Sequence, residues 1–193
     1  MRRLIVCNIV SLDGFYSGPG GDLGCMPFDA GFSDYNAERL RCADTLLLGR
    51  TTFEMFRSYW PGVASDPDQS PLEREISRLN TSIEKLVVSD SLTPDRLQGW
   101  GPARAIPRAG ARAAIADLER GEGKDILVFG SHVLWNDLLE AGLVDELHLM
   151  IGPGVVGAGI RAFEAGPTGR LRLLGTEAFD GSSLLLVRYG VER

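Results

Sequence analysis

Two stretches of the sequence join a short apolar strand to an amphipathic helix through glycine and hydroxyl residues. One is Gly49-Arg50-Thr51-Thr52, and the other is Gly130-Ser131-His132. Glycine lets the backbone turn tightly, and Ser131 is a good N-cap because its hydroxyl can accept a hydrogen bond from the first turn. Open N–H groups and the positive end of the helix dipole suit a phosphate, and Arg50 adds a fork-shaped donor. Each joint alone also fits a connection that binds nothing, but two together favour a phosphate-bearing ligand.

A carboxylate follows the first predicted strand, where the sequence reads Ser11-Leu12-Asp13-Gly14-Phe15. Ligands of open α/β sheets bind at the carboxyl ends of strands, so Asp13 is a candidate site residue. The same aspartate also fits an Asx-turn that only closes the loop. Residues 152–157 match the pattern GxGxxG, but the glycines and prolines after them leave no room for the helix that a dinucleotide fingerprint requires. A glycine-rich loop there could still form one wall of a pocket.

The composition is that of an ordinary soluble globular domain, with 193 residues, 44% of them hydrophobic and 24% charged. The net charge of −6 and the lack of a Lys/Arg cluster exclude a general nucleic-acid binder. The three cysteines and two histidines show no metal-ligand spacing, so no metal site is predicted. Because no apolar run resembles a signal peptide or a membrane span, we expect one domain, residues 1–193, in the cytoplasm.

The elements that position these residues alternate between strands and helices until the last thirty or so residues. Ser70-Pro71-Leu72-Glu73 has the form of a capping box at a helix start, whereas Tyr59-Trp60-Pro61-Gly62 is expected to end the helix before it. An Asp180–Ser183 turn predicts a C-terminal hairpin. We expect strands at 4–10, 45–48, 85–89, 103–106, 126–129, 144–151, 171–179 and 184–189, and helices at 33–43, 110–120 and after residues 49, 70 and 130. The sequence thus predicts a mixed-sheet α/β domain of about eight strands.

Taken in order, these pieces resemble the dihydrofolate reductase fold, a three-layer α/β fold with a mostly parallel sheet and an antiparallel C-terminal hairpin. The closer likeness is to the reductase domain of the bifunctional riboflavin-biosynthesis deaminase–reductase and to its stand-alone relatives. The stretches that carry the resemblance are Val10–Phe15, Leu47–Glu54, Val87-Val88-Ser89, Asp125–Leu139, Val144–Leu147 and Pro153–Phe163.

The resemblance implies an NADPH-dependent reductase that passes a hydride to a pterin or aminopyrimidine, as dihydrofolate reductase and 5-amino-6-(5-phosphoribosylamino)uracil reductase do. It implies that Arg50 pairs with the 2′-phosphate that distinguishes NADP from NAD. Asp13 would be the catalytic residue and the polar anchor of the substrate, and a homodimer is expected. The implied cofactor-binding residues are Val10, Gly49, Arg50, Thr51, Thr52, Ser89, Gly130, Ser131, His132, Val133 and Leu134, and the implied substrate-binding residues are Asp13, Phe15, Phe28, Trp60 and Pro153.

The sequence departs from the family pattern at two places. Gly130-Ser131 stands where the family usually has Gly-Gly, and the added Cβ restricts φ and close approach to a phosphate. Asp29 and Asp34 both lie near the position of the pterin-binding carboxylate of dihydrofolate reductase, and the sequence does not decide between them. The alternative hypothesis is therefore a non-catalytic nucleotide-binding or interaction protein that retains the fold.

Overall fold

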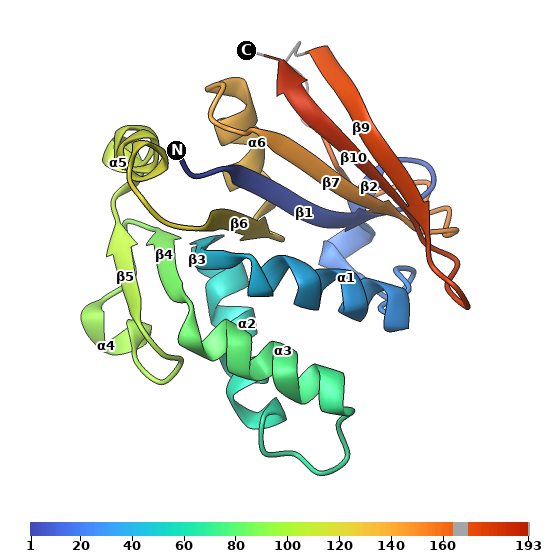
Figure 1. The fold of residues 1–193 in the computed structure, drawn as a ribbon, viewed down its shortest axis with the longest axis horizontal. Coiled ribbons are helices and arrows are strands. Elements are labelled where there is room, and N and C mark those ends of the chain that lie inside the picture. Colours follow the sequence, from blue (N-terminus) through green and yellow to red (C-terminus); the bar gives the residue numbers. More distant parts are fainter. Residues whose placement is uncertain (164–169, 193) are drawn as a thin grey trace.

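A central eight-stranded sheet with helices on both faces forms the protein, seen in a computed structural model that describes residues 1–163 and 170–192 (Figure 1). The helices are α1 Ala30–Arg41, α2 Arg50–Val63, α3 Pro71–Ser82, α4 Pro94–Leu97, α5 Arg108–Arg120 and α6 His132–Glu140, with a 3-10 turn at Pro19–Gly21. The strands are β1 Leu4–Val10, β2 Phe15–Ser17, β3 Ala43–Gly49, β4 Glu84–Val88, β5 Ala103–Ile106, β6 Asp125–Phe129, β7 Glu146–Ile151, β8 Ile160–Arg161, β9 Arg170–Ala178 and β10 Leu185–Glu192.

The strand order in the sheet is β5-β4-β3-β6-β1-β7-β10-β9. The six strands from β5 to β7 run parallel, and β10 and β9 close the sheet as an antiparallel pair. Strands β2 and β8 form a separate two-stranded ribbon. Because β3, β6 and β1 are parallel neighbours, their carboxyl ends lie side by side at one edge of the sheet. The predicted mixed sheet with its C-terminal hairpin is therefore confirmed.

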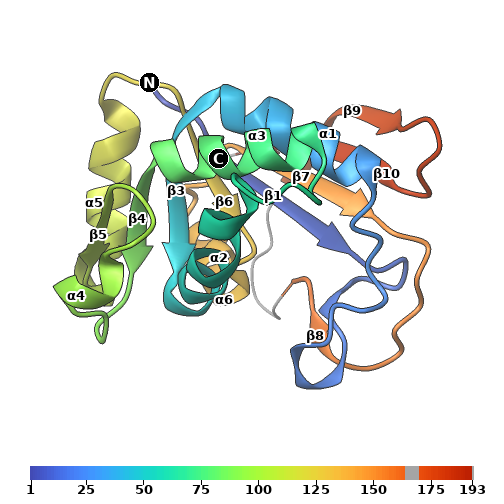
Figure 2. The ribbon, with the colours of Figure 1, turned by 90° about the horizontal axis from the view of Figure 1, so that it is seen from below.

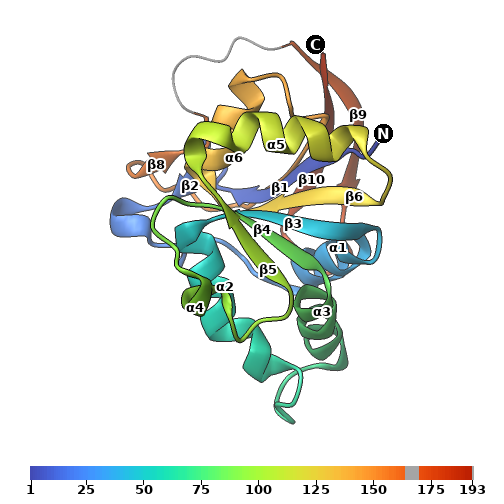
Figure 3. The same cartoon turned by 90° about the vertical axis from the view of Figure 1, so that its left-hand side faces the viewer.

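The central strands are buried on both faces, which explains why they consist of apolar runs rather than alternating patterns. Along β1, Ile5, Cys7 and Ile9 pack with α1, α2 and α3, whereas Leu4 and Val6 pack with α5 and α6. Figures 2 and 3 show α1, α2 and α3 on one side of the sheet, and α5 and α6 on the opposite side. The result is three layers with two apolar cores.

The end of α2 and the start of α1 differ from the prediction for identifiable reasons. Helix α2 continues through Pro61 to Val63. The proline removes one backbone hydrogen bond, but only two helical residues follow it, so the loss is small and the helix is not broken there. Helix α1 begins at Ala30 instead of residue 33, because the carboxylate of Asp29 accepts a hydrogen bond from the N–H of Phe32 and caps the first turn. The capping box at Ser70 is confirmed by the bond from the N–H of Glu73 to the Ser70 hydroxyl.

The glycine-rich segment 152–159 lies in a loop between β7 and β8, and within the described residues no helix follows it. The loop therefore lacks, among the described residues, the helix that a dinucleotide fingerprint requires. In the described part of the chain, none of the helices combines the length and the apolar character that a membrane crossing needs.

Candidate functional site

The two glycine-containing joints meet at the edge of the sheet where β3 and β6 end. The N–H of Gly49 donates to the Ser131 hydroxyl at 3.0 Å, and the N–H of Ser131 donates to Oγ1 of Thr52 at 3.0 Å. These two hydrogen bonds link the start of α2 to the start of α6. The sequence predicted a phosphate site at each joint, and the structure places the two joints side by side.

Ser131 adopts an unusual backbone conformation at this junction. Its φ and ψ are 54° and 45°, and it is the only non-glycine residue with a positive φ among those described. The prediction that its hydroxyl caps α6 is wrong, because that oxygen accepts the N–H of Gly49 instead. No side chain caps either α2 or α6, so both helices present their first-turn N–H groups together with the positive ends of their dipoles.

Gly130 occupies a position that favours glycine. Its φ is +56°, and an added Cβ would lie 3.0 Å from Cγ2 of Thr52 and 3.2 Å from the hydroxyl of Tyr16. Residue 130 carries no side chain, and it also lines the cavity described below, where another group can approach its backbone closely. Together with the two uncapped helices, this geometry suits a diphosphate such as the one in a nicotinamide dinucleotide.

Other residues predicted to contact a cofactor are placed less directly. The Arg50 side chain is nearly half exposed and lies 3.9 Å from the carboxylate of Glu54, so it can reach a ligand at this edge. Ser89 is buried, and its hydroxyl accepts the N–H groups of Ser91 and Leu92, both at 3.2 Å. Val10 is buried in a small cluster with Leu149 and Ala162. Arg50 is thus available for binding, whereas the Ser89 hydroxyl is engaged in its own turn.

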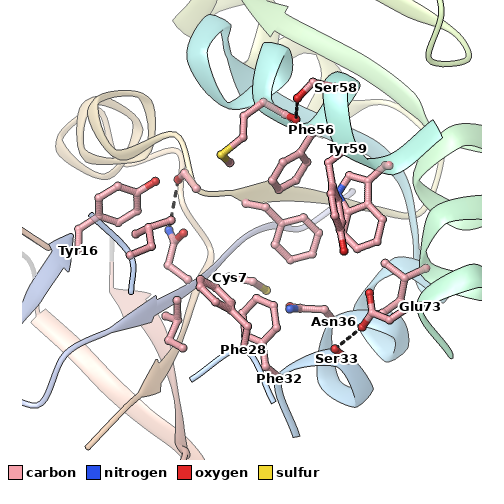
Figure 4. A pocket seen from close by; sticks show the side chains of 18 residues that line it. Cys7, Tyr16, Phe28, Phe32, Ser33, Asn36, Phe56, Ser58, Tyr59 and Glu73 are labelled. Carbon is pink, nitrogen blue, oxygen red and sulfur yellow. Dashed lines mark hydrogen bonds between the residues drawn. The ribbon is translucent and has the colours of Figure 1, made fainter. Parts of the chain in front are cut away.

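A cavity of about 550 Å³ opens beside this junction, at the carboxyl ends of β1 and β6 and under α1, α2 and α3 (Figure 4). Aromatic side chains dominate its walls. Phe28 and Trp60, both predicted to contact substrate, line it, whereas Phe15, Asp13 and Pro153 are not among its lining residues. The lining residues are Cys7, Asn8, Ile9, Tyr16, Leu23, Phe28, Phe32, Ser33, Asn36, Met55, Phe56, Ser58, Tyr59, Trp60, Glu73, Ile76, Phe129 and Gly130.

The carboxylate of Asp13 holds a loop. It accepts hydrogen bonds from the Ser11 hydroxyl at 2.6 Å and from the N–H groups of Val156 and Gly157 at 3.1 Å and 2.8 Å. The Ser11 hydroxyl first, and then the Gly157 and Val156 N–H groups, lower the pKa of Asp13 to about 2. This side chain fixes the turn after β1 to the loop after β7, which differs from the predicted role as a substrate anchor.

Neither aspartate near α1 reaches the cavity. Asp29 caps α1 with one oxygen and accepts the Ser182 hydroxyl with the other, and Asp34 is exposed. Asn36 reaches the cavity instead: it is 7% exposed, points from α1 into the cavity (Figure 4), and its Oδ1 has no hydrogen-bond partner within the described structure. The sequence offered one signal for a role of Asn36: this polar residue lies on the apolar side of the predicted helix.

These features can be compared with known proteins. The model of the RibD C-terminal domain matches residues 2–185. The chain belongs to the RibD C-terminal domain family. The uncharacterized protein YyaP of Bacillus subtilis strain 168 is 32% identical over 190 residues, which cover 96% of this chain and 94% of YyaP.

Two solved structures show that this RibD C-terminal domain has a dihydrofolate reductase-like fold. One is a diaminohydroxyphosphoribosylaminopyrimidine deaminase/5-amino-6-(5-phosphoribosylamino)uracil reductase from Thermotoga maritima, with a TM-score of 0.68 and 11% identity, covering 99% of this chain and 57% of the enzyme. The other is dihydrofolate reductase from Enterococcus faecalis in complex with NADP(H) and RAB-propyl, with a TM-score of 0.60 and 15% identity. This match covers 99% of this chain and 97% of the reductase. The family and these neighbours are of the reductase type.

Beside the cavity, the RibD C-terminal domain contains a buried hydrogen-bonded histidine that sequence reasoning missed. Nε2 of His148 donates to the Glu146 carboxylate at 2.8 Å, and Nδ1 accepts the Tyr35 hydroxyl at 2.8 Å. Burial lowers the pKa of His148 although Glu146 opposes that shift. The sulfur of Cys7, on the cavity floor, lies 3.8 Å from Nδ1, and burial raises the pKa of Cys7 to about 12. Burial thus favours the uncharged forms of both His148 and Cys7.

The β2–β8 ribbon joins the cavity to the first turn of α6. The ring of Tyr16, which lines the cavity, lies 5.1 Å from the ring of His132, and Nε2 of His132 donates to the carbonyl of Arg161 at 2.7 Å. The guanidinium of Arg161 in turn lies 5.0 Å from the ring of Phe15. Phe15 therefore supports the ribbon from outside the cavity.

Proposed function

We propose that this protein is an NADPH-dependent reductase that transfers a hydride to a small heterocyclic substrate such as a pterin or an aminopyrimidine. The observation that carries the proposal is the junction of two uncapped helix N-termini at Gly130, a residue that also lines the aromatic cavity. A dinucleotide with its phosphates at this junction would have one end beside the cavity. The likeness to an NADP(H)-binding dihydrofolate reductase supports the same conclusion.

The residues of the junction would bind and orient the cofactor, which supplies the hydride. The first-turn N–H groups of α2 and α6, with the bare backbone of Gly130, suit its diphosphate. Arg50 offers a charged, bidentate donor for the additional phosphate of NADPH. His132, Val133 and Leu134 contribute through their position in the first turn of α6.

The cavity residues would orient the substrate and exclude water. The rings of Phe28 and Phe32 meet edge to face at 5.0 Å, and those of Phe56 and Trp60 at 6.3 Å, so the walls favour a flat ring. At the floor, Cys7 keeps its proton at neutral pH because burial raises its pKa to about 12. The protein therefore contributes mainly binding and orientation.

Thermal unfolding with added cofactor tests the proposal. NADPH at about 100 times its Kd should stabilise the protein by about 2.7 kcal/mol, and no stabilisation at millimolar NADPH would contradict the proposal. Replacing Arg50 with alanine should weaken NADPH by about tenfold or more and leave NADH nearly unchanged, because only NADPH carries the additional phosphate. Arg120→Ala, at the last residue of α5 and outside the junction, is the matched control. Equal losses for both cofactors would remove the assigned role of Arg50.

The alternative, a nucleotide-binding protein without turnover, is favoured by one observation. The Ser131 hydroxyl already accepts the N–H of Gly49, which is one of the donors that a phosphate could use. Oxidation of NADPH in the presence of dihydrofolate or an aminouracil substrate separates the two functions. Binding of NADPH with no oxidation across such a substrate panel would support the alternative.

A further inference from the structure

The charge of the cavity restricts what it can bind. Glu73, from α3, contributes the only carboxylate among the described lining residues, and none of these residues is a lysine or an arginine. Oε1 of Glu73 accepts the Ser33 hydroxyl at 2.5 Å, which holds the carboxylate at the cavity wall (Figure 4). A phosphate monoester carries about two negative charges at neutral pH, so it would meet a like charge here with no cation to offset it.

The polar groups of the cavity suit a neutral, flat ring. Asn36 is 7% exposed and points into the cavity, and its Oδ1 has no protein partner in the described chain. A buried amide oxygen without a partner is costly, and a ligand can satisfy it once the Asn36 side chain rotates to present it. A side-chain amide offers a donor and an acceptor side by side, which matches the adjacent carbonyl and N–H of a lactam. The N–H of Trp60, another lining residue, is also buried without a partner.

We infer that the substrate is a planar heterocycle with a lactam edge and no phosphate, held at that edge by Asn36 and screened against phosphate by Glu73. The inference rests on the proposed function in that it describes the substrate of the same cavity. It deepens that proposal, because it separates phosphate-free heterocycles from phosphorylated ones.

A matched pair of ligands tests the inference: 5-amino-6-ribitylaminouracil and its 5′-phosphate, which share one lactam ring. We expect isothermal titration calorimetry, with and without NADP⁺, to show that the phosphate-free probe binds and that its phosphate binds about tenfold more weakly or worse. Equal or tighter binding of the phosphate overturns the inference. Failure of both probes to bind also overturns it.

Two substitutions assign the effect to named side chains. Glu73→Gln keeps an acceptor for Ser33 and removes the charge, so it should tighten the phosphate probe several-fold and change the phosphate-free probe little. Asn36→Leu keeps the size of the side chain and removes the unpartnered amide, so it should leave Tm unchanged or higher and weaken the phosphate-free probe by about tenfold. Asp34→Asn, on the exposed side of α1, is the control.

These results can be separated from a failure of the proposed function. The ratio of the two probe affinities is measured without turnover, whereas the proposed function fails if NADPH does not stabilise the protein. Wild-type affinities for both probes in Asn36→Leu and Glu73→Gln would overturn the inference even if NADPH binds.

Discussion

Replacing Ser131 with glycine and with alanine separates two opposing contributions to the free energy of unfolding. Both variants lose the hydroxyl that accepts the N–H of Gly49, a neutral hydrogen bond of about 1 kcal/mol. At φ 54° and ψ 45°, a residue with a Cβ is strained by roughly 1–2 kcal/mol, and only glycine relieves this strain. Glycine also gains about 0.5–1 kcal/mol of conformational freedom in the unfolded chain, which offsets part of the relief. We therefore expect Ser131→Gly to be more stable than Ser131→Ala by about 0.5–1 kcal/mol.

Urea unfolding followed by circular dichroism measures this difference directly. Ser131→Ala should lie about 1 kcal/mol below the wild type, and Ser131→Gly should lie close to the wild type. In a thermal scan, the two variants should differ by roughly 1–4 °C for a chain of this size. If the alanine variant equals or exceeds the glycine variant in stability, the backbone of residue 131 is not strained and the reasoning is refuted.

Three further predictions concern ionisable groups. Burial lowers the pKa of His148, so the unfolded chain binds the proton more readily and the free energy of unfolding should fall below about pH 6.5. The urea midpoint measured against pH should show this fall, and His148→Gln should make the dependence flatter. Burial lowers the pKa of Lys85 to about 8, so wild-type stability should rise between about pH 8 and 10, and an equal rise in Lys85→Met would contradict this. Asp13→Asn should speed amide hydrogen exchange at Val156 and Gly157 by roughly tenfold, and unchanged exchange would exclude the loop-holding role.

The fold was predictable because its determinants are local. Apolar runs such as 126–129 are typical of strands buried on both faces, and the capping box at Ser70 indicates a helix start. The order of strands and helices then leaves few topologies. The expected cofactor-binding residues, the homodimer and the cytoplasmic location stay predictions.

The details of the site were less predictable because they depend on partners distant in the sequence. The Ser131 hydroxyl bonds to a residue 82 positions away, and the Asp13 carboxylate to one 144 positions away. A serine before a helix usually caps it, and an aspartate after a strand often closes a turn. For Ser131, the contact with the N–H of Gly49 replaced the capping role. Asn36 could be located on its helix, but its lack of a partner becomes visible only when the cavity is formed.

The contact between Tyr16 and His132 has a thermodynamic consequence. Tyr16 belongs to the cavity and His132 to the first turn of α6, so the substrate and the proposed cofactor would each bind against one member of a pair of rings in tilted contact. By linkage, if the cofactor changes the affinity for the substrate by some factor, the substrate must change the affinity for the cofactor by the same factor. Replacing Tyr16 with leucine should therefore reduce this coupling equally in both directions, so that the two sites bind more independently.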